Sequence, residues 1–238
     1  YVNNSDSEKT VEIMKKCVIL QSNYIPWKGY FDLINEADTF VFHDDLQYTK
    51  RDWRNRNILK SKERKLWLSI PVGSSEKRLI DEVRLPEDNV WRGQHRSTIQ
   101  EIYGGAKYFE EVEELIFPTL MNLKIVTLSE LNRELIRKIS EFLGIDTIFT
   151  DTRVLSASGS KVGKLVEICR KVGADCYLSG PAAKNYIGDE FQENGISLQW
   201  MEYGPYPEYD QFGKDFEHAV SIIDLIAHTG HAAADHIW

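Results

Sequence analysis

Short apolar runs alternate with amphipathic segments along this chain, and the alternation limits the folds that it can adopt. Strand-like runs occupy residues 17–20, 39–43, 66–72, 147–150, 176–180 and 197–203. Apolar runs of this length, bounded by polar residues, are typical of buried strands. Because helical segments separate most of them, the sequence predicts an α/β fold with a mainly parallel sheet flanked by helices, a Rossmann-like arrangement.

Helical periodicity marks the segments between the strands. From Ser129 the apolar residues share one face up to Gly144, which predicts a helix with Ser129 as N-cap and Gly144 as its stop. Further helices are expected over 24–35, 161–173 and 216–228, with an interrupted one over 97–123. Residues 1–16 are expected to form a polar lead-in or to be a truncated start. No Gly-, Pro- or Ser-rich linker divides the rest of the chain. A single α/β domain then covers 17–238, with a C-terminal helix and tail and a soft subdivision near 120–130.

Composition excludes several classes of protein. The 238 residues suffice for a core without disulfides, and the net charge of −8 argues against a general nucleic-acid binder. No apolar run approaches the ~20 residues that span a bilayer, and the N-terminal segment lacks the apolar core of a signal peptide. Cys17, Cys169 and Cys176 form no CxxC pair, so we expect buried, reduced thiols in a cytoplasmic protein. The spacing of the histidines fits no common metal motif, so no metal site is expected.

Polar residues follow three of the predicted strands. They are Gln21, Ser22, Asn23 and Tyr24; His43, Asp44, Asp45 and Gln47; and Ser179 with Gly180. Ligands of open α/β sheets bind beyond the carboxyl ends of the strands, so these side chains are candidates for a binding site. Turn formation alone is the alternative explanation, although glutamine is a poor turn former.

A basic run covers residues 50–65. It holds eight basic and two acidic residues, so the rest of the chain carries −14. Arginines alternate there with Trp53 and two asparagines, which favours an anion site for a phosphorylated ligand. A solvated basic face and RNA binding remain the alternatives. In a helical arrangement Arg51 and Asn55 would share one side, so not every charge could reach one ligand.

Two other segments hold candidate groups. His95 is a possible general base besides His43. Residues 156–164 invite comparison with a P-loop, but their spacing differs from GxxxxGK[ST]. They predict a Ser-capped helix start whose amides would bind phosphate only weakly.

The segments QSNYIPWKGYFDLI and DTFVFHDDLQYTKRDWRNRN resemble the opening of the WbqC-like family, which is found with bacterial O-antigen and surface-glycan genes. The resemblance continues through SIPVG, a Trp91–His95 pair, ADCYLSGPAAKNYI and SIIDLIAHTG, and thus spans residues 17–230. One departure concerns the family's His-Gln-Pro, which is Leu20-Gln21-Ser22 here. If that histidine is a catalytic base, its role passes to His43, Asp44 or His95.

The resemblance implies a transferase of lipopolysaccharide and O-antigen biosynthesis that attaches a glycyl, aminoacyl or related acyl group to a nucleotide-linked amino sugar. Its candidate residues follow from the polar clusters above. The acid–base candidates are His43, Asp44, Asp45 and His95. The diphosphate would lie on Arg51, Arg54 and Arg56, with Trp53 near the base or sugar. The remaining substrate-binding candidates are Gln21, Asn23, Tyr24, Trp27, Gln47, Asn57, Ser179 and Gly180.

The acyl donor and the mechanism stay open at this point. A preactivated donor, either a carrier-protein thioester or an aminoacyl-tRNA, is favoured over ATP because no Walker motif is present. One alternative is an ATP-using, Rossmann-like nucleotidyltransferase or ligase, although the HxGH histidines of such enzymes are missing. Another is a non-catalytic module that binds a nucleotide-sugar. Neither DNA nor a membrane span is expected, and the oligomeric state is not predicted.

Overall fold

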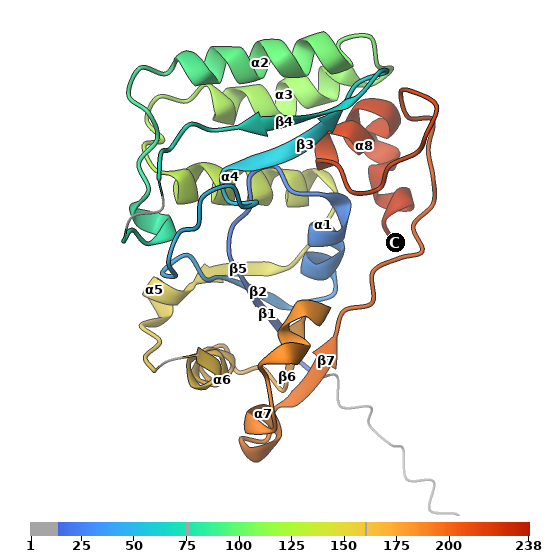
Figure 1. The fold of residues 1–238 in the computed structure, drawn as a ribbon. Helices are drawn as coiled ribbons and strands as arrows, with labels where there is room; N and C mark the ends of the chain where they lie inside the picture. Colours follow the sequence, from blue (N-terminus) through green and yellow to red (C-terminus); the bar gives the residue numbers. More distant parts are fainter. Residues whose placement is uncertain (1–13, 75–76, 160) are drawn as a thin grey trace, which may run out of the picture.

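The computed structural model describes residues 14–74, 77–159 and 161–238 (Figure 1). Five parallel strands form one sheet, in the order β5-β2-β1-β6-β7. They are β1 (Lys16–Leu20), β2 (Thr39–Phe42), β5 (Ile148–Asp151), β6 (Cys176–Ser179) and β7 (Ser197–Trp200). The α/β prediction is therefore confirmed. Because the strand order reverses between β1 and β6, this is the point where α/β sheets usually bind ligands.

Apolar side chains on both faces of the sheet form two cores. Val18 and Phe40 pack on the side of α1 (Lys28–Asn35) and α4 (Leu128–Phe142). Cys17 and Val41 pack on the other side, with α6 (Lys161–Lys171). Two short helices, α5 (Thr152–Leu155) and α7 (Glu190–Glu193), border this second side. Burial on both faces explains why the central strands β1, β2 and β6 are mainly apolar runs.

A second layer is built around an antiparallel hairpin of β3 (Arg56–Lys60) and β4 (Lys65–Ser69). In Figure 1 this hairpin lies beside α2, α3 and α8, on the far side of α1 and α4 from β6 and β7. The helices of this layer are α2 (Val90–Tyr103), α3 (Phe109–Leu120) and α8 (Ile222–Thr229). Three 3-10 segments complete the described elements: η1 (Ile80–Glu82), η2 (Pro181–Asn185) and η3 (Gly230–His236).

Several local predictions need correction. Part of the basic run forms β3, because Asn57 and Leu59 point into the core while Arg56 and Ile58 stay half-exposed. The predicted strand at 66–72 is β4, which pairs with β3 outside the parallel sheet. Thr127, rather than Ser129, caps α4 through a capping box with Glu130. The helix expected over 216–228 begins only at Ile222.

Other expectations concern the chain's ends and its compartment. Residues 1–13 of the predicted lead-in and Ser160 of the predicted helix start lie outside the described residues, and Lys16 already belongs to β1. The three cysteines are buried and unpaired, as predicted. Within the described ranges, every helix is too short or too polar to cross a bilayer.

Candidate functional site

The carboxyl ends of β1 and β2 carry the first group of predicted site residues. Leu20 is paired with Phe42 in the parallel register, so Gln21 and His43 lie side by side just beyond the sheet. The two loops are tied together there, because the backbone N–H of Ser22 donates to Asp44 Oδ1 over 2.8 Å. The sheet therefore brings these predicted residues together at one edge.

Asp44 is completely buried and bonded through both carboxylate oxygens. Oδ1 accepts from Ser22, while Oδ2 accepts from the Ser129 hydroxyl and, over 2.9 Å, from Arg133 Nε. Arg133 also lies 3.2 Å from Asp151 at the end of β5. Charge-assisted bonds of this kind are strong, so Asp44 holds α4 and the loops of β1 and β5 in place.

His43 and Asp45 form a second buried pair at the end of β2. His43 Nε2 lies 3.5 Å from Asp45 Oδ1. Burial lowers the pKa of His43, and Asp45 opposes this only in part, so the imidazole is uncharged near pH 7. Burial raises the pKa of Asp45, but bonds from Lys164 and Thr152 outweigh it and lower the pKa overall. An uncharged imidazole beside an ionised carboxylate has the protonation state of a general base.

Arg54 lies at the junction between this edge and the hairpin. Its guanidinium donates to Asn23 Oδ1 and, over 3.4 Å, to Gln21 Oε1. Asp52 approaches it at 3.5 Å. Buried Asn132 of α4 fixes the backbone by donating to the Arg54 carbonyl over 2.8 Å. Arg54 therefore connects the basic run to the loop after β1.

A cavity of about 190 Å³ opens beside Arg54. It is lined by Asn23, Pro26, Trp27, Trp53, Asn57 and Ala219. The Trp27 ring contacts that of Tyr203, with centroids 5.3 Å apart. A Cβ atom at Gly180 would lie 3.4 Å from the Tyr203 hydroxyl, so this wall reaches the end of β6. Trp27 and Tyr203 thus connect the wall of the cavity to the end of β6.

The loop before α1 has a strained backbone that shapes this cavity. Ile25 has φ of 41°, which is unfavourable for a β-branched residue. Asn57 Nδ2 donates to the carbonyls of Tyr24 and Ile25 over 3.0 Å each, and Ser221 Oγ donates to the Ile25 carbonyl over 2.8 Å. These bonds hold the loop against its preferred conformation. Asn57 therefore lines the cavity and also holds the loop before α1 in place.

His95 connects Tyr24 of the same loop to the hairpin. Its Nε2 lies 3.0 Å from the Ser69 carbonyl, which can only accept, so Nε2 carries the proton. Its Nδ1 then accepts from the Tyr24 hydroxyl over 2.9 Å. Burial lowers the pKa of His95 to about 4, although the bond to Ser69 opposes this effect. Because both ring nitrogens are hydrogen-bonded, His95 holds the Tyr24 hydroxyl in place.

The remaining predicted residues lie around this centre. Arg56 stacks over Trp67, with 3.9 Å from Cζ to the ring centroid, and donates to the Arg51 carbonyl over 2.5 Å. Gln47 Nε2 donates to the Arg78 carbonyl over 3.0 Å. The backbone of Gln47 also forms an isolated antiparallel bridge with Leu79. Ser179 is buried at the end of β6.

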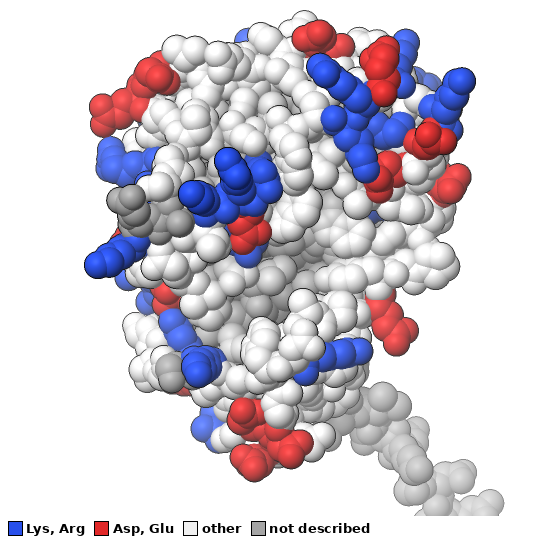
Figure 2. All heavy atoms as spheres, in the orientation of Figure 1, with Lys and Arg blue, Asp and Glu red and all other residues white. Residues whose placement is uncertain are grey.

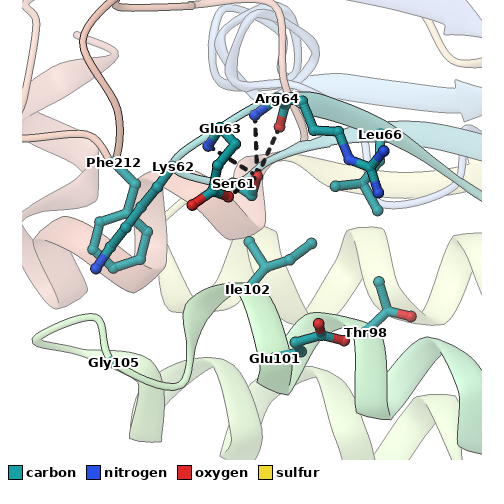
Figure 3. Close-up of a pocket in the computed structure, with 10 residues that line it drawn as sticks. All are labelled: Ser61, Lys62, Glu63, Arg64, Leu66, Thr98, Glu101, Ile102, Gly105 and Phe212. Carbon is teal, nitrogen blue, oxygen red and sulfur yellow. Dashed lines mark hydrogen bonds between the residues drawn. The ribbon is translucent and has the colours of Figure 1, made fainter.

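The basic run is divided between the two ends of the hairpin. Figure 2 shows Lys and Arg side chains gathered over the start of β3, at the rim of a hollow, and again over the hairpin tip. A second cavity of about 590 Å³ lies at that tip, where Lys62 extends along the Phe212 ring and α2 contributes Thr98 and Glu101 (Figure 3). Only the first half of the run therefore meets the predicted site.

Several contributors to the site were not predicted, among them Asn132, Arg133, Lys164 and Tyr203. Asn132 carried a signal, since a polar residue within the apolar face of the predicted 129–144 helix needs a buried partner. Lys164 lies in the segment compared with a P-loop, but its partner Asp45 is 119 residues away in sequence. Within the described ranges, no group of three or more His, Cys, Asp or Glu residues is arranged to hold a metal ion.

Comparisons with known proteins find close similarity along nearly the whole chain. The model of the WbqC-like protein family matches residues 21–236. A Mycobacterium tuberculosis protein described as "Uncharacterized protein Rv1507c" is 38% identical over 227 residues, which cover 94% of this chain and 98% of that protein. No solved structure matches the chain.

Proposed function

Because this chain belongs to the WbqC-like protein family, we propose that it is a glycan-biosynthesis transferase acting on a nucleotide-linked amino sugar. The family membership confirms the resemblance that the motifs after 17–20 and 39–43 indicated. The proposal rests mainly on Arg54. Its guanidinium donates to two amide oxygens and lies beside an aromatic cavity near the strand-order switch point. A guanidinium in that place suits a diphosphate, since it offers paired donors to phosphate oxygens.

The volume of the cavity limits what it can hold. At about 190 Å³ it is smaller than the roughly 300–1,000 Å³ of pockets that enclose drug-sized ligands. It suits one sugar ring or one amino acid, between the faces of Trp27 and Trp53. In the proposed complex, the diphosphate lies on Arg54 and the sugar enters this cavity, with Asn23 facing its polar groups and Asn57 forming part of the wall.

The proposed reaction is acyl transfer to the sugar amine. The amine nitrogen attacks the carbonyl carbon of a preactivated acyl donor, a C–N bond forms, and the bond to the leaving oxygen or sulfur breaks. His43 accepts the proton that the nitrogen loses, and the leaving group is protonated in turn. Asp45 orients the imidazole and stabilises its charged form. Gln21 donates to the oxyanion.

Asp44 and His95 take positioning roles in this proposal. Asp44 already has both oxygens bonded, and His95 has both nitrogens bonded, so neither has an open site for a substrate proton. Asp45 also has both oxygens bonded, to Thr152 and Lys164, so His43 is the remaining proton acceptor and Asp45 is its charged partner.

The binding half of the proposal is tested by titrating nucleotide-sugars into the protein by calorimetry at two salt concentrations. Arg54→Ala should weaken binding about tenfold to a hundredfold and reduce its salt dependence, because a charge-assisted contact to phosphate is lost. Arg64→Ala is the matched control, since it removes an arginine from the opposite end of the same run. Equal affinity of wild type and Arg54→Ala at both salt concentrations would count against the phosphate role.

The catalytic half is tested by supplying acyl donors and following the mass of the sugar. His43→Gln should keep nucleotide-sugar affinity and lower turnover by about 10²–10⁴-fold. Product formation that requires free amino acid and consumes ATP would indicate the ligase alternative. Tight binding with no turnover on any donor class would indicate a binding module.

A further inference from the structure

The outer face of the β3–β4 hairpin is left uncovered, and its composition is unusual. Side chains alternate along both strands: Asn57, Leu59 and Leu68 are buried, whereas Arg56, Ile58 and Trp67 lie on the opposite face. Trp67 is 47% exposed and Trp53, just before the hairpin, is 43% exposed. Large aromatic side chains that gather on a surface in this way mark interaction sites.

The two tryptophans form one surface with an arginine. Their ring centroids are 5.5 Å apart with an interplanar angle of 39°, and Arg56 stacks 3.9 Å from the Trp67 centroid. We call Trp53, Trp67 and Arg56 the stacking platform. Flat π-systems and a planar guanidinium offer stacking faces for bases.

The charge around the platform indicates which kind of ligand would stack on its aromatic rings. Lys50 and Arg51 are exposed at one end, and Lys65 is exposed at the other, where it pairs with Glu217. The first part of the basic run, residues 50–56, alone carries +3 in a chain of net charge −8. A neutral glycan needs aromatic faces but no such cations. A single strand of nucleic acid needs both, since its bases stack while its phosphates attract cations.

We propose that the stacking platform binds the unpaired 3′ end of an acylated RNA, which supplies the acyl group. This inference rests on the proposed transferase function and names its donor. The sugar amine attacks the ester carbonyl carbon, the C–N bond forms, the C–O bond to the terminal ribose breaks, and the ribose oxygen takes up a proton. Unpaired RNA is the form recognised here, because only unpaired bases expose their faces to aromatic side chains.

The platform adjoins the place where transfer would occur. Trp53 belongs to the platform and also lines the 190 Å³ cavity. The accessible part of the hairpin face extends about 7 Å from Arg56 to Ile58, which is room for one or two stacked bases. A strand stacked on this face would direct its terminal ester toward the cavity, where Arg54 holds the acceptor.

Fluorescence anisotropy of a labelled six-nucleotide RNA with an unpaired 3′ end tests the binding step on the full chain. Trp67→Ala should weaken RNA binding about tenfold or more, because one base loses its stacking partner. Trp67→Phe should restore most of the affinity. Trp238→Ala is the matched control, since that tryptophan is 46% exposed at the C-terminus. A fully paired hairpin RNA should bind more weakly than the single strand.

The acceptor site is measured separately with the same variants. Trp67→Ala should leave nucleotide-sugar affinity within twofold, whereas Arg54→Ala should lower it. Failure of RNA binding with intact nucleotide-sugar binding overturns the donor assignment alone. Failure of nucleotide-sugar binding with intact RNA binding overturns the proposed acceptor instead.

Three results would overturn the RNA assignment. The first is equal RNA affinity in wild type and Trp67→Ala. The second is full displacement of the RNA by nucleotide-sugar, which would make the platform the base site of the acceptor. The third is a Trp67→Ala variant that binds an acidic carrier protein or a neutral oligosaccharide more weakly than wild type but binds RNA equally well. Transfer from an aminoacylated RNA to the sugar amine, lost in Trp67→Ala and kept in Trp67→Phe, completes the case.

Discussion

The acid stability of this protein should depend on His95, which links the loop before α1 to the hairpin. Its two ring nitrogens bond Tyr24 and Ser69, and its pKa is lowered from 6.5 to about 4, chiefly by burial. The unfolded chain therefore binds a proton at His95 over a pH range in which the folded protein does not. It follows that the free energy of unfolding falls as the pH drops through this range.

The two pKa values set the size of the effect. With about 4 in the folded state and 6.5 in the unfolded state, the loss is about 2 kcal/mol at pH 5 and about 3 kcal/mol at pH 4. Above pH 6.5 the contribution is constant. With a urea m-value of about 3 kcal/mol/M, a loss of 2 kcal/mol lowers the urea midpoint by about 0.7 M.

Urea denaturation at pH 7 and pH 5 measures this loss, and His95→Gln is the comparison that isolates it. Glutamine can donate to the Ser69 carbonyl and accept from the Tyr24 hydroxyl, but it does not titrate. The wild type should lose about 2 kcal/mol more than His95→Gln between the two pH values. Other acid-sensitive groups affect both proteins equally and cancel in the comparison.

Parallel loss of stability in the two proteins would refute the reasoning, because it would mean that His95 is not held neutral in the fold. A second measurement separates the positioning role from catalysis. His95→Gln should retain most of the turnover at pH 7, since both hydrogen bonds are kept. Loss of turnover by 10²-fold or more, with stability unchanged, would return His95 to the acid–base candidates.

Three further predictions concern other buried polar groups. Asp44→Asn should cost about 2–3 kcal/mol of stability in urea denaturation at pH 7, because the charge-assisted bonds to Ser129 and Arg133 weaken; a loss under 0.5 kcal/mol would contradict this. Lys28 is buried among aromatic rings and burial lowers its pKa from 10.5 to about 8, so its contribution to stability should rise between pH 8 and 10.5; in thermal denaturation the stability of wild type relative to Lys28→Met should increase over this range. Thr127→Ala should lower the free energy of unfolding by about 1 kcal/mol because it removes the cap of α4. Ser129→Ala should instead act through the lost bond to Asp44. Helix content followed during urea denaturation compares the two variants.

The parallel sheet could be predicted from the sequence because burial on both faces makes its central strands, β1, β2 and β6, mainly apolar runs. The hairpin was harder to predict, because β3 reads Arg-Asn-Ile-Leu-Lys and its inward residues include Asn57. An asparagine that faces the core has no period-2 hydrophobic signal. Its role emerges only with the strained loop at Ile25, whose carbonyl it binds. Long-range polar bonds of this kind leave no local pattern.

The candidate site shows the same division. Gln21, Asn23, His43 and Asp45 were identified because polar residues at strand ends meet at one edge of an α/β sheet. The sequence could not distinguish Asp44 from Asp45, although they are neighbours. The partners that distinguish them, Arg133 on α4 and Lys164 on α6, come from opposite faces of the sheet. Only the packed fold shows that Asp44 is completely buried, whereas Asp45 stays partly exposed beside His43.

Those partners also explain why Arg54 is the cation best placed for a substrate. Asp44 and Asp45 each have a nearby cation of their own, Arg133 and Lys164, so the two buried carboxylates are already compensated. Arg54 instead bonds neutral amide oxygens, and its carboxylate neighbour Asp52 lies at 3.5 Å and is partly exposed. Exposed ion pairs contribute about 0–1 kcal/mol. A diphosphate can therefore displace Asp52 from Arg54 at little cost, without breaking either buried ion pair.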